Sequence, residues 1–223
     1  MDYDWEGCFN SIQLVLGYPL NDRVQQQLQR YTQYLLEWNR TYNLIGPAAV
    51  HDLLSRHILD SVSLIPLLPE TAKIADMGSG AGLPGLILAM LSPPSRQFHL
   101  YEANQKKSRF LNYIATELQL IDRAHIHKQR VEELHPDSHT YDITTCRALA
   151  SLEIIAKLSR SLLKPDGVCL AMKGRNAPDE IHIFKNSKLE KYFTSPTIHP
   201  IPHNPEGMII QMRMVSRETG MHP

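Results

Sequence analysis

Apolar positions in the first 70 residues recur at helical spacing. Their intervals of three and four residues align the side chains along one stripe of a helix. The members of the first stripe are Val24, Leu28, Tyr31, Leu35 and Trp38. Asn21 and Asp22 precede the stripe and carry side chains that cap helix N-termini. A second apolar segment follows Pro47, and no run in this region alternates as a strand would, so the pattern predicts a helical lead.

From Lys73 onward, short apolar runs alternate with amphipathic segments. The runs predict strands at residues 74–77, 98–101, 125–127, 141–146 and 168–172. The segments between and after them predict helices at residues 84–91, 106–120, 152–163 and 179–185. Repeated strand–helix units are typical of a parallel, doubly wound sheet, and the runs 191–201 and 208–215 predict an antiparallel pair that closes it. Residues 164–167, Lys-Pro-Asp-Gly, predict a turn.

This change of pattern predicts two parts, a helical extension over residues 1–70 and a sheet domain over residues 71–223. A length of 223 residues suits one large domain with such an appended piece. With 43% hydrophobic and 21% charged residues, the composition is globular and excludes disorder or a repeat array as the main architecture. The longest apolar stretch is too short to cross a bilayer, so no membrane association is expected.

Cysteine usage and the start of the chain indicate the compartment. The three cysteines are Cys8, Cys146 and Cys169, an odd number without a C-x-x-C pair. This usage is atypical of a disulfide framework or a zinc knuckle and indicates a reducing compartment. The first residues are acidic, whereas a signal peptide begins with a basic segment followed by an apolar one. We therefore expect a cytoplasmic location.

The charge balance is even but unevenly distributed. The chain holds 23 basic and 23 acidic residues, and this neutral total at first argues against a nucleic-acid partner. Divided by region, however, the net charge is −4 over residues 1–70, +1 over 71–150 and +3 over 151–223. Seven bases and three acids lie within residues 96–130. A neutral total therefore limits non-specific RNA affinity without excluding a local basic site.

A glycine-rich run at residues 76–85 is the clearest ligand-binding motif in the chain. It follows a predicted strand and opens a predicted helix, where free backbone N–H groups can meet a ligand. Read from Gly80, it is the G-x-G-x-x-G dinucleotide fingerprint, and Gly80 is predicted to contact a cofactor. Read from Asp76, it is the D-x-G-x-G-x-G form of S-adenosylmethionine-dependent methyltransferases, with Asp76 facing the methionine end. Glu102 ends the next predicted strand and can accept the ribose hydroxyls of either cofactor.

Beyond this motif, the chain resembles the bacterial small-subunit ribosomal RNA guanine-N7 methyltransferases, also called the glucose-inhibited division protein B family. The matching stretches keep the family order and are residues 37–39, 42–44, 56–61, 76–85, 107–111, 130–133, 147–152 and 173–174. Many methyltransferases share the glycine loop. The combination of His-Ile-Leu-Asp-Ser, Gly-Leu-Pro-Gly and Arg-Ala-x-Ala-Ser is highly specific.

The resemblance implies a fold and a set of cofactor residues. The fold would be an α/β, Rossmann-like methyltransferase sheet, mostly parallel, with an N-terminal helical extension. Gly78 and Leu83 would line the S-adenosylmethionine pocket, and Val131 and Glu132 would lie beside the adenine. Arg147 would lie near the methyl-transfer site.

Departures from the family pattern are few. Ser79 and Ala81 stand where the family often has Thr and Pro, and Glu102 stands where Asp is common. Leu149 replaces a frequent Phe, so a stacking role at this position is not carried over.

The implied reaction makes few chemical demands on side chains. Guanine N7 carries a lone pair and no proton, so its methylation requires no general base, and the protein has to align the reactants. His57 and Asp60 lie three residues apart and can share a helix face, where a structural or lid role is expected. His125 and His127 share one face of a predicted strand, but no further ligand is spaced to complete a metal site, and no metal is expected.

Cations follow the fourth and fifth predicted strands. Arg147 follows the fourth strand and is predicted to contact the guanine, a phosphate or the cofactor carboxylate. Its neighbour Cys146 is predicted to pack in the core rather than to act as a nucleophile. Lys173 and Arg175 follow the fifth strand and are predicted to bind RNA phosphate.

The leading interpretation is a methyltransferase that acts on 16S ribosomal RNA, free or within the 30S particle, with no obligate protein partner evident. RNA bases are usually recognised where they are unpaired. Two alternatives stay open. One is an NAD-dependent oxidoreductase, which rests on the glycine fingerprint, and the other is a non-catalytic RNA-binding module that keeps the cofactor fold.

Overall fold

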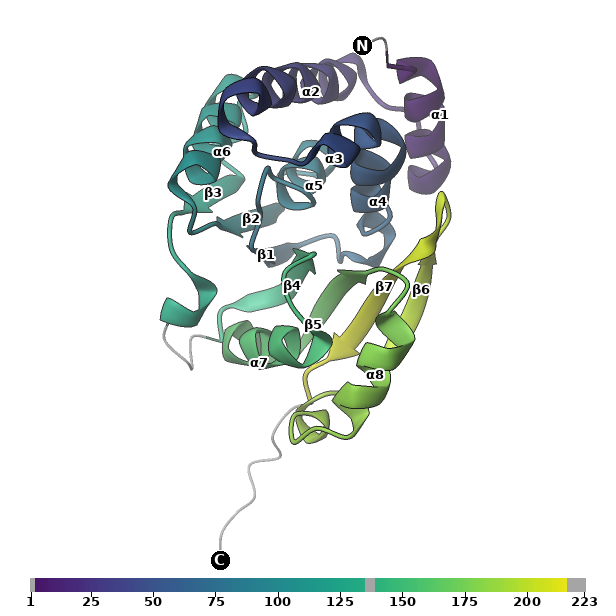
Figure 1. Ribbon diagram of the computed structural model, residues 1–223, viewed down its shortest axis with the longest axis vertical. Helices are drawn as coiled ribbons and strands as arrows, with labels where there is room; N and C mark the ends of the chain where they lie inside the picture. Colours follow the sequence, from purple (N-terminus) through teal and green to yellow (C-terminus); the bar gives the residue numbers. More distant parts are fainter. Residues whose placement is uncertain (1–2, 135–138, 216–223) are drawn as a thin grey trace, which may run out of the picture.

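A seven-stranded sheet runs through the protein in the order β3-β2-β1-β4-β5-β7-β6 (Figure 1). The computed structural model describes residues 3–134 and 139–215. The strands are β1 (Ala72–Met77), β2 (Arg96–Tyr101), β3 (Ala124–His127), β4 (Tyr141–Arg147), β5 (Leu163–Lys173), β6 (Thr197–Ile201) and β7 (Asn204–Arg213). Strands β1 to β5 are parallel, β7 is antiparallel to β5, and β6 is antiparallel to β7. The predicted parallel sheet with an antiparallel closing pair is confirmed.

Helices cover both faces of this sheet. They are α1 (Trp5–Leu16), α2 (Asp22–Tyr42), α3 (Pro47–His51), α4 (Leu59–Val62), α5 (Gly85–Leu91), α6 (Gln105–Glu117), α7 (Leu152–Leu162) and α8 (Ala177–Lys185). Figure 1 shows α1 to α6 on one side of the sheet and α7 and α8 on the other. Asn21 caps α2 by accepting the N–H of Val24 at 2.9 Å, as predicted. Along the described ranges, no helix has the length and apolar character that crossing a membrane would need.

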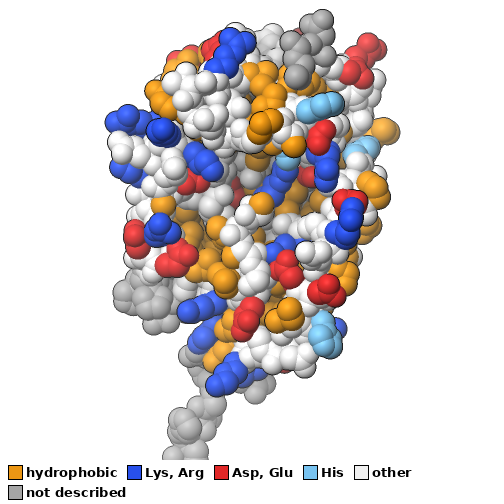
Figure 2. All heavy atoms as spheres, viewed as in Figure 1, with side chains coloured by type: hydrophobic (Ala, Val, Ile, Leu, Met, Phe, Trp, Pro, Cys, Tyr) orange, Lys and Arg blue, Asp and Glu red, His pale blue; other side chains and the backbone are white. Residues whose placement is uncertain are grey.

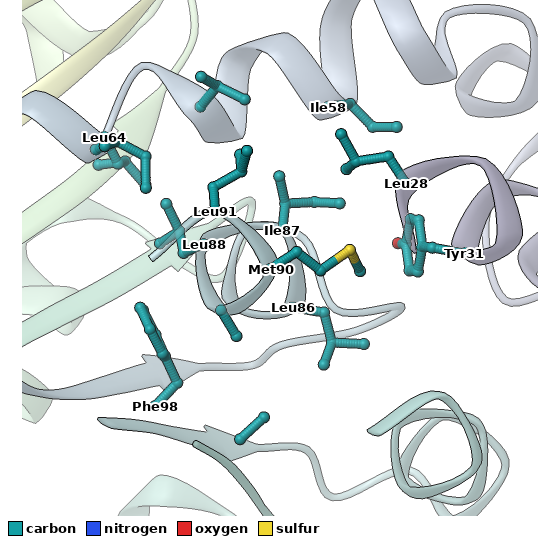
Figure 3. Close-up of a cluster of buried hydrophobic side chains, with 14 of the residues drawn as sticks. Leu28, Tyr31, Ile58, Leu64, Leu86, Ile87, Leu88, Met90, Leu91 and Phe98 are labelled. Atoms are coloured by element: carbon teal, nitrogen blue, oxygen red, sulfur yellow. The ribbon is translucent and has the colours of Figure 1, made fainter. Parts of the chain in front are cut away.

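The N-terminal helices share one core with the sheet. All seven residues of α5 are buried, because this helix lies between the sheet and the helical lead. Leu28, Tyr31 and Ile58 of the lead lie around Ile87 in the same cluster as Phe98 of β2 (Figure 3). Each such aliphatic or aromatic side chain contributes about 1.5–3 kcal/mol when it leaves water. The lead therefore packs against the sheet domain.

Two segments differ from their sequence-based predictions. Residues 164–167 lie inside β5 as a bulge, since Tyr141 pairs with Leu163 and Ile143 pairs with Val168. Between these pairs, β4 advances two residues and β5 advances five, so the predicted turn residues bulge out of a ladder that continues on both sides. The run 191–201 forms a strand only from Thr197, because residues 190–192 make a 3₁₀ turn.

Candidate functional site

The predicted site residues converge at the carboxyl ends of the parallel strands. Met77, the last residue of β1, pairs with Tyr101 of β2 and with Cys146 of β4. The next residue along each strand therefore lies at the same edge of the sheet, which brings Gly78, Glu102 and Arg147 there. The strand order reverses between β1 and β4, and open α/β sheets bind ligands at such a switch point.

The glycine loop needs its glycines for conformation and for space. Gly78, Gly80 and Gly82 have φ angles of 69°, 58° and 94°, a region that side chains disfavour. A Cβ on Gly78 would lie 2.7 Å from Cδ1 of Leu149 in the loop after β4. The Ser79 N–H donates to the carbonyl of Tyr101 at 3.0 Å, so the loop is held against the end of β2.

Glu102 is part of this loop's support. Its Oε2 accepts the N–H of Gly80 at 2.9 Å, and its Oε1 accepts the N–H of Asn104 at 2.7 Å. Each carboxylate oxygen has a second lone pair, so both can still accept a hydroxyl. The arrangement is compatible with the predicted ribose contact, and that contact stays a prediction.

Asp76 lies in the interior of the fold, whereas its motif suggested that it faces the methionine end of the cofactor. It is fully buried, its Oδ2 accepts the N–H of Gly85 at 3.1 Å, and its Oδ1 accepts the hydroxyl of Thr145 at 3.1 Å. Burial raises the pKa of Asp76 to about 6, although the hydrogen bonds from Ser79, Thr145 and Gly85 favour the charged form. The interpretation that Asp76 faces a methionine end stays a prediction, since each oxygen has one partner inside the fold and a second lone pair. The carboxylate ties β4 to the first residue of α5.

The residues expected at the adenine lie on one flank of the loop. Val131 is buried in the apolar cluster that also contains Met77 and Tyr101, and Leu149 packs against this cluster. Glu132 is exposed beside it. Leu83 is half-buried and packs against the core on the other side of the sheet. Val131 and Leu149 thus belong to the hydrophobic cluster on one side of the sheet, and Leu83 belongs to the cluster on the other side.

Arg147 is held by the N-terminal helices. Its guanidinium contacts Nδ1 of His57 and donates to the His57 carbonyl at 3.3 Å. Because Arg can only donate, Nδ1 must accept, and the proton of a neutral His57 lies on Nε2. That Nε2 is buried, and no hydrogen-bond partner for it exists among residues 3–134 and 139–215. Burial lowers the pKa of Arg147 to about 10, which leaves it charged at neutral pH.

Lys173 and Arg175 differ in their environments. Lys173 has a side chain only 9% exposed, and its Nζ lies 2.6 Å from Glu180 Oε2 and 2.5 Å from the carbonyl of Ala150. This ammonium is engaged within the fold, so the prediction that Lys173 binds RNA phosphate conflicts with its geometry. Arg175 is 77% exposed and pairs with Glu206, which keeps it at the predicted surface position.

A polar cavity of about 370 Å³ opens between these strand ends and the β6–β7 hairpin. Its charged and amide walls include Arg56, Asp60, Arg147, Lys173, Asn204 and Glu206. The volume falls in the range of about 300–1,000 Å³ that small-molecule sites occupy. Sequence reasoning assigned no role to Arg56, although it lies in the matching stretch 56–61, and it missed Asn204, whose local sequence does not mark it as part of a site. A larger, mostly apolar cavity of about 730 Å³ lies beside α7, and its walls include Val131 and Glu132, the residues predicted at the adenine.

The remaining candidates do not add a reactive group. Cys146 is fully buried, and burial raises the pKa of its thiol well above the usual value, which favours the unreactive protonated form. In the described ranges, no group of three or more His, Cys, Asp or Glu side chains is placed to hold a metal ion. His127 Nε2 instead lies 2.9 Å from His99 Nδ1 across β2 and β3.

Charged side chains of both signs surround this region. In the view of Figure 1, Lys and Arg side chains intermingle with Asp and Glu instead of forming one basic field (Figure 2). This distribution agrees with the neutral total and with a weak general attraction for RNA.

Comparisons with known proteins identify relatives over most of the chain. Residues 24–203 match the GidB family, described as rRNA small subunit methyltransferase G. The curated ribosomal RNA small subunit methyltransferase G of Stutzerimonas stutzeri is 41% identical over 167 residues, which is 74% of this chain and 76% of that protein. The protein of the same name from Paramagnetospirillum magneticum is 36% identical over 197 residues, 86% of this chain and 89% of the relative.

Solved structures share the fold at low sequence identity. A SAM-dependent methyltransferase from Aquifex aeolicus aligns with a TM-score of 0.60 at 12% identity, over 77% of this chain and all of that one. A geranyl diphosphate C-methyltransferase from Streptomyces coelicolor, crystallised with S-adenosyl-L-homocysteine, aligns with a TM-score of 0.58 at 13% identity, over 75% of this chain and 82% of that one. These likenesses concern the fold.

Proposed function

Because the chain belongs to the family of rRNA small subunit methyltransferase G, we propose that it methylates N7 of one guanine in 16S ribosomal RNA. The chain is an S-adenosylmethionine-dependent ribosomal RNA methyltransferase. The guanine, its N7 atom and the 30S particle as the working substrate are our proposal. Of the two cofactors that the glycine loop allowed, S-adenosylmethionine is therefore the one that this family uses.

One observation carries the proposal: Arg147 belongs to two parts of the site at once. It ends β4 at the edge where the glycine loop follows β1, and it also lines the polar cavity. A methyl donor held by the loop would therefore lie next to a cavity in which a base can enter. Among the described residues 146–151, at the end of β4 and before α7, Arg147 alone carries a charge.

The residues present fit S-adenosylmethionine. Gly78 and Gly80 have positive φ and no side chain, so the backbone of the loop can approach a ligand closely. Glu102 retains acceptor capacity for ribose hydroxyls. When bound, S-adenosylmethionine supplies a methyl group on a cationic sulfur; the N7 lone pair forms the C–N bond as the C–S electron pair returns to sulfur.

This reaction requires no proton transfer, and the site is built accordingly. The last residue of β4 is Arg147, a permanent cation that cannot accept a proton. Cys146 and Asp76 are enclosed in the fold, and neither reaches the cavity. The protein's part is therefore to orient the base and to keep water out, which favours N7 over an exocyclic amine that must lose a proton.

The 30S particle suits the charge distribution better than free RNA of arbitrary sequence. An exposed Arg175 at the cavity rim is paired with Glu206, so little unpaired positive charge is offered there. A shaped ribosomal target then has to supply affinity that a basic field would otherwise give.

Transfer of radiolabelled methyl groups tests the proposal. The protein would be incubated with labelled S-adenosylmethionine and with either 16S RNA or 30S particles from cells that lack it. We expect label in the particle and weak competition by RNA of unrelated sequence. No label in either substrate would contradict the proposal and favour a non-catalytic binding module. Tight NADH binding without S-adenosylmethionine binding would favour an oxidoreductase instead.

A further inference from the structure

Asp60 is a buried carboxylate for which the reaction described so far has no use. It lies on α4, is 5% exposed and lines the polar cavity that Arg147 also lines. Its Oδ2 accepts the side-chain amide of Asn204 at 3.1 Å, whereas its Oδ1 is buried with no hydrogen-bond partner in the part of the chain that the structure describes. Buried acceptors are nearly always paired, so an unpaired one in a cavity indicates a missing donor.

The surroundings of Asp60 define what that donor has to be. Burial raises the pKa of Asp60 to about 6, while the Asn204 amide and the charges of Arg56 and His203 oppose this rise. At neutral pH the group is therefore mainly a carboxylate, which accepts hydrogen bonds and donates none. Arg56 and Arg147, which also line the cavity, contribute positive charge and donors. The cavity therefore combines acceptors, among them the unpaired Oδ1 of the buried Asp60, with donors, as a base with both kinds of group requires.

We propose that Asp60 recognises the target guanine by accepting hydrogen bonds from its N1–H and its exocyclic amine. This inference rests on the proposed function. Guanine is the base with two adjacent donors on its Watson–Crick edge, whereas adenine has an acceptor at N1 and no amine at C2. Contacts on that edge leave N7, on the opposite side of the purine, free to meet the methyl group.

The same contact also serves the reaction. Methylation at N7 places a positive charge on the purine ring, which makes N1–H and the amine stronger donors. A fixed carboxylate at these donors is therefore bound more tightly in the transition state than in the ground state. Asp60 would consequently raise the turnover number as well as select the base.

A purely structural role for Asp60 explains the hydrogen bond at one of its two carboxylate oxygens and leaves the other oxygen unexplained. The bond from Asn204 to Oδ2 joins α4 to the β6–β7 hairpin, and this bond would suffice to hold the hairpin. It does not account for the buried and unpaired Oδ1 of a residue that lines the cavity. The two roles make different predictions for a substrate that lacks a single donor.

Inosine provides that substrate, because it keeps N7, O6 and N1–H and lacks only the exocyclic amine. Particles or RNA, whichever the wild-type protein methylates, would carry guanosine or inosine at the target position. We expect wild-type kcat/KM to fall about tenfold or more on inosine, the effect of one hydrogen bond to a charged group. In Asp60→Ala, guanosine is expected to lose a similar factor and the guanosine-to-inosine ratio to approach one.

Two further variants complete the design. Asp60→Asn keeps the size of the side chain and removes its charge, and we expect reduced kcat with unchanged affinity for S-adenosylmethionine measured by calorimetry. Asp52→Asn is the matched control, since Asp52 lies on the same segment outside the cavity and pairs with Arg56 at 3.9 Å. We expect this control to keep the wild-type ratio.

The outcomes separate this inference from the proposed function. If the wild-type protein transfers no methyl group to RNA, the proposed function fails. If it methylates guanosine and inosine equally, or if both Asp60 variants lower the two rates by the same factor, Asp60 does not contact the amine and the inference is overturned. Should Asp60→Ala fail to fold, the ratio measured with Asp60→Asn decides.

Discussion

Arg147 and His57 are separated by 90 positions in sequence, yet the Arg147 guanidinium binds both Nδ1 and the carbonyl oxygen of His57. This contact joins the carboxyl end of β4 to the helical lead. It gives the lead a direct part in the site, since Arg147 is the cation that stands between the glycine loop and the polar cavity. The His-Ile-Leu-Asp-Ser stretch thus places His57 against Arg147 and Asp60 at the cavity wall.

The orientation of Arg147 should depend on His57. His57→Ala removes the imidazole acceptor, so we expect methyl transfer to fall about tenfold because the guanidinium is no longer held in one geometry. The free energy of unfolding should change much less than the rate. His51→Ala is the control, because this histidine is 87% exposed on α3 and is expected to leave the rate unchanged. Equal rates for His57→Ala and wild type would remove the positioning role.

The glycine loop should tolerate no side chain at Gly78. Gly78→Asp adds a charge and a Cβ that would lie 2.7 Å from Leu149, at a φ of 69°. We expect affinity for S-adenosylmethionine to fall at least a hundredfold while circular dichroism shows a folded chain, because the loop lies at the surface edge of the sheet. Gly46→Ala has open space around it and should bind as the wild type does. Retained affinity in Gly78→Asp would contradict the assignment of the loop.

Asp76 and Asp142 should affect stability with opposite signs as pH changes. Burial raises the pKa of Asp76 from 3.8 to about 6, so the native state holds a proton that the unfolded state releases between these values. The contribution of Asp76 to stability is therefore fully present below pH 3.8 and declines by about 3 kcal/mol as pH rises to 6. For Asp142, burial acts to raise the pKa, but the hydrogen bonds from Lys164 and from the Lys73 N–H outweigh it and lower the pKa, so the contribution of Asp142 to stability is lost as pH falls.

Urea unfolding between pH 4 and 7 measures both effects. The difference in free energy of unfolding between wild type and Asp76→Asn should shift against the wild type as pH rises. The same difference for Asp142→Asn should shift in favour of the wild type, by a smaller amount because this carboxylate is partly exposed. A flat profile for Asp76→Asn would show that the carboxylate titrates as it does in water.

The two cations after β5 should separate into a structural and a surface role. Lys173→Ala removes the ammonium from Glu180, which is 23% exposed and still accepts the N–H of Leu152 at 2.6 Å, so we expect the free energy of unfolding to fall by about 1–3 kcal/mol. Arg175→Ala should leave stability unchanged and weaken binding to the particle. If Arg175 contacts a phosphate, the slope of log affinity against log salt should fall by about one in this variant. Loss of particle affinity in a stably folded Lys173→Ala would restore the original prediction for Lys173.

Local sequence was sufficient for features that depend on neighbouring residues. The strand–loop–helix at 72–91 was predictable because glycines at positive φ and an apolar helix leave a signature within one segment. Asn21 was predictable as a cap for the same reason. The bulge at 164–167 was not, because Lys-Pro-Asp-Gly also suits a turn, and only the pairing of β4 with β5 shows that the ladder continues.

Contacts between residues far apart in the sequence explain the roles that local sequence patterns did not predict. Asp60 meets Asn204 across 144 positions, and neither residue carries a local sign that it lines a cavity. Lys173 follows a strand at the binding edge, as a phosphate ligand would, yet Glu180 on α8 is placed to neutralise it. Asp76 belongs to a ligand motif, but its carboxylate is taken up by the N–H of Gly85 and the hydroxyl of Thr145. Each of these roles depends on a partner that only the fold brings near.

Mapping of the methylated nucleotide tests the central claim most directly. 30S particles from cells that lack this protein would be incubated with it and S-adenosylmethionine, and their 16S RNA would then be treated with borohydride and aniline, which cleave at N7-methylguanosine. The account predicts one new cleavage, at a single guanine, which is absent when Gly78→Asp replaces the wild type. Methylation at another atom, or at many guanines without selection, would contradict it.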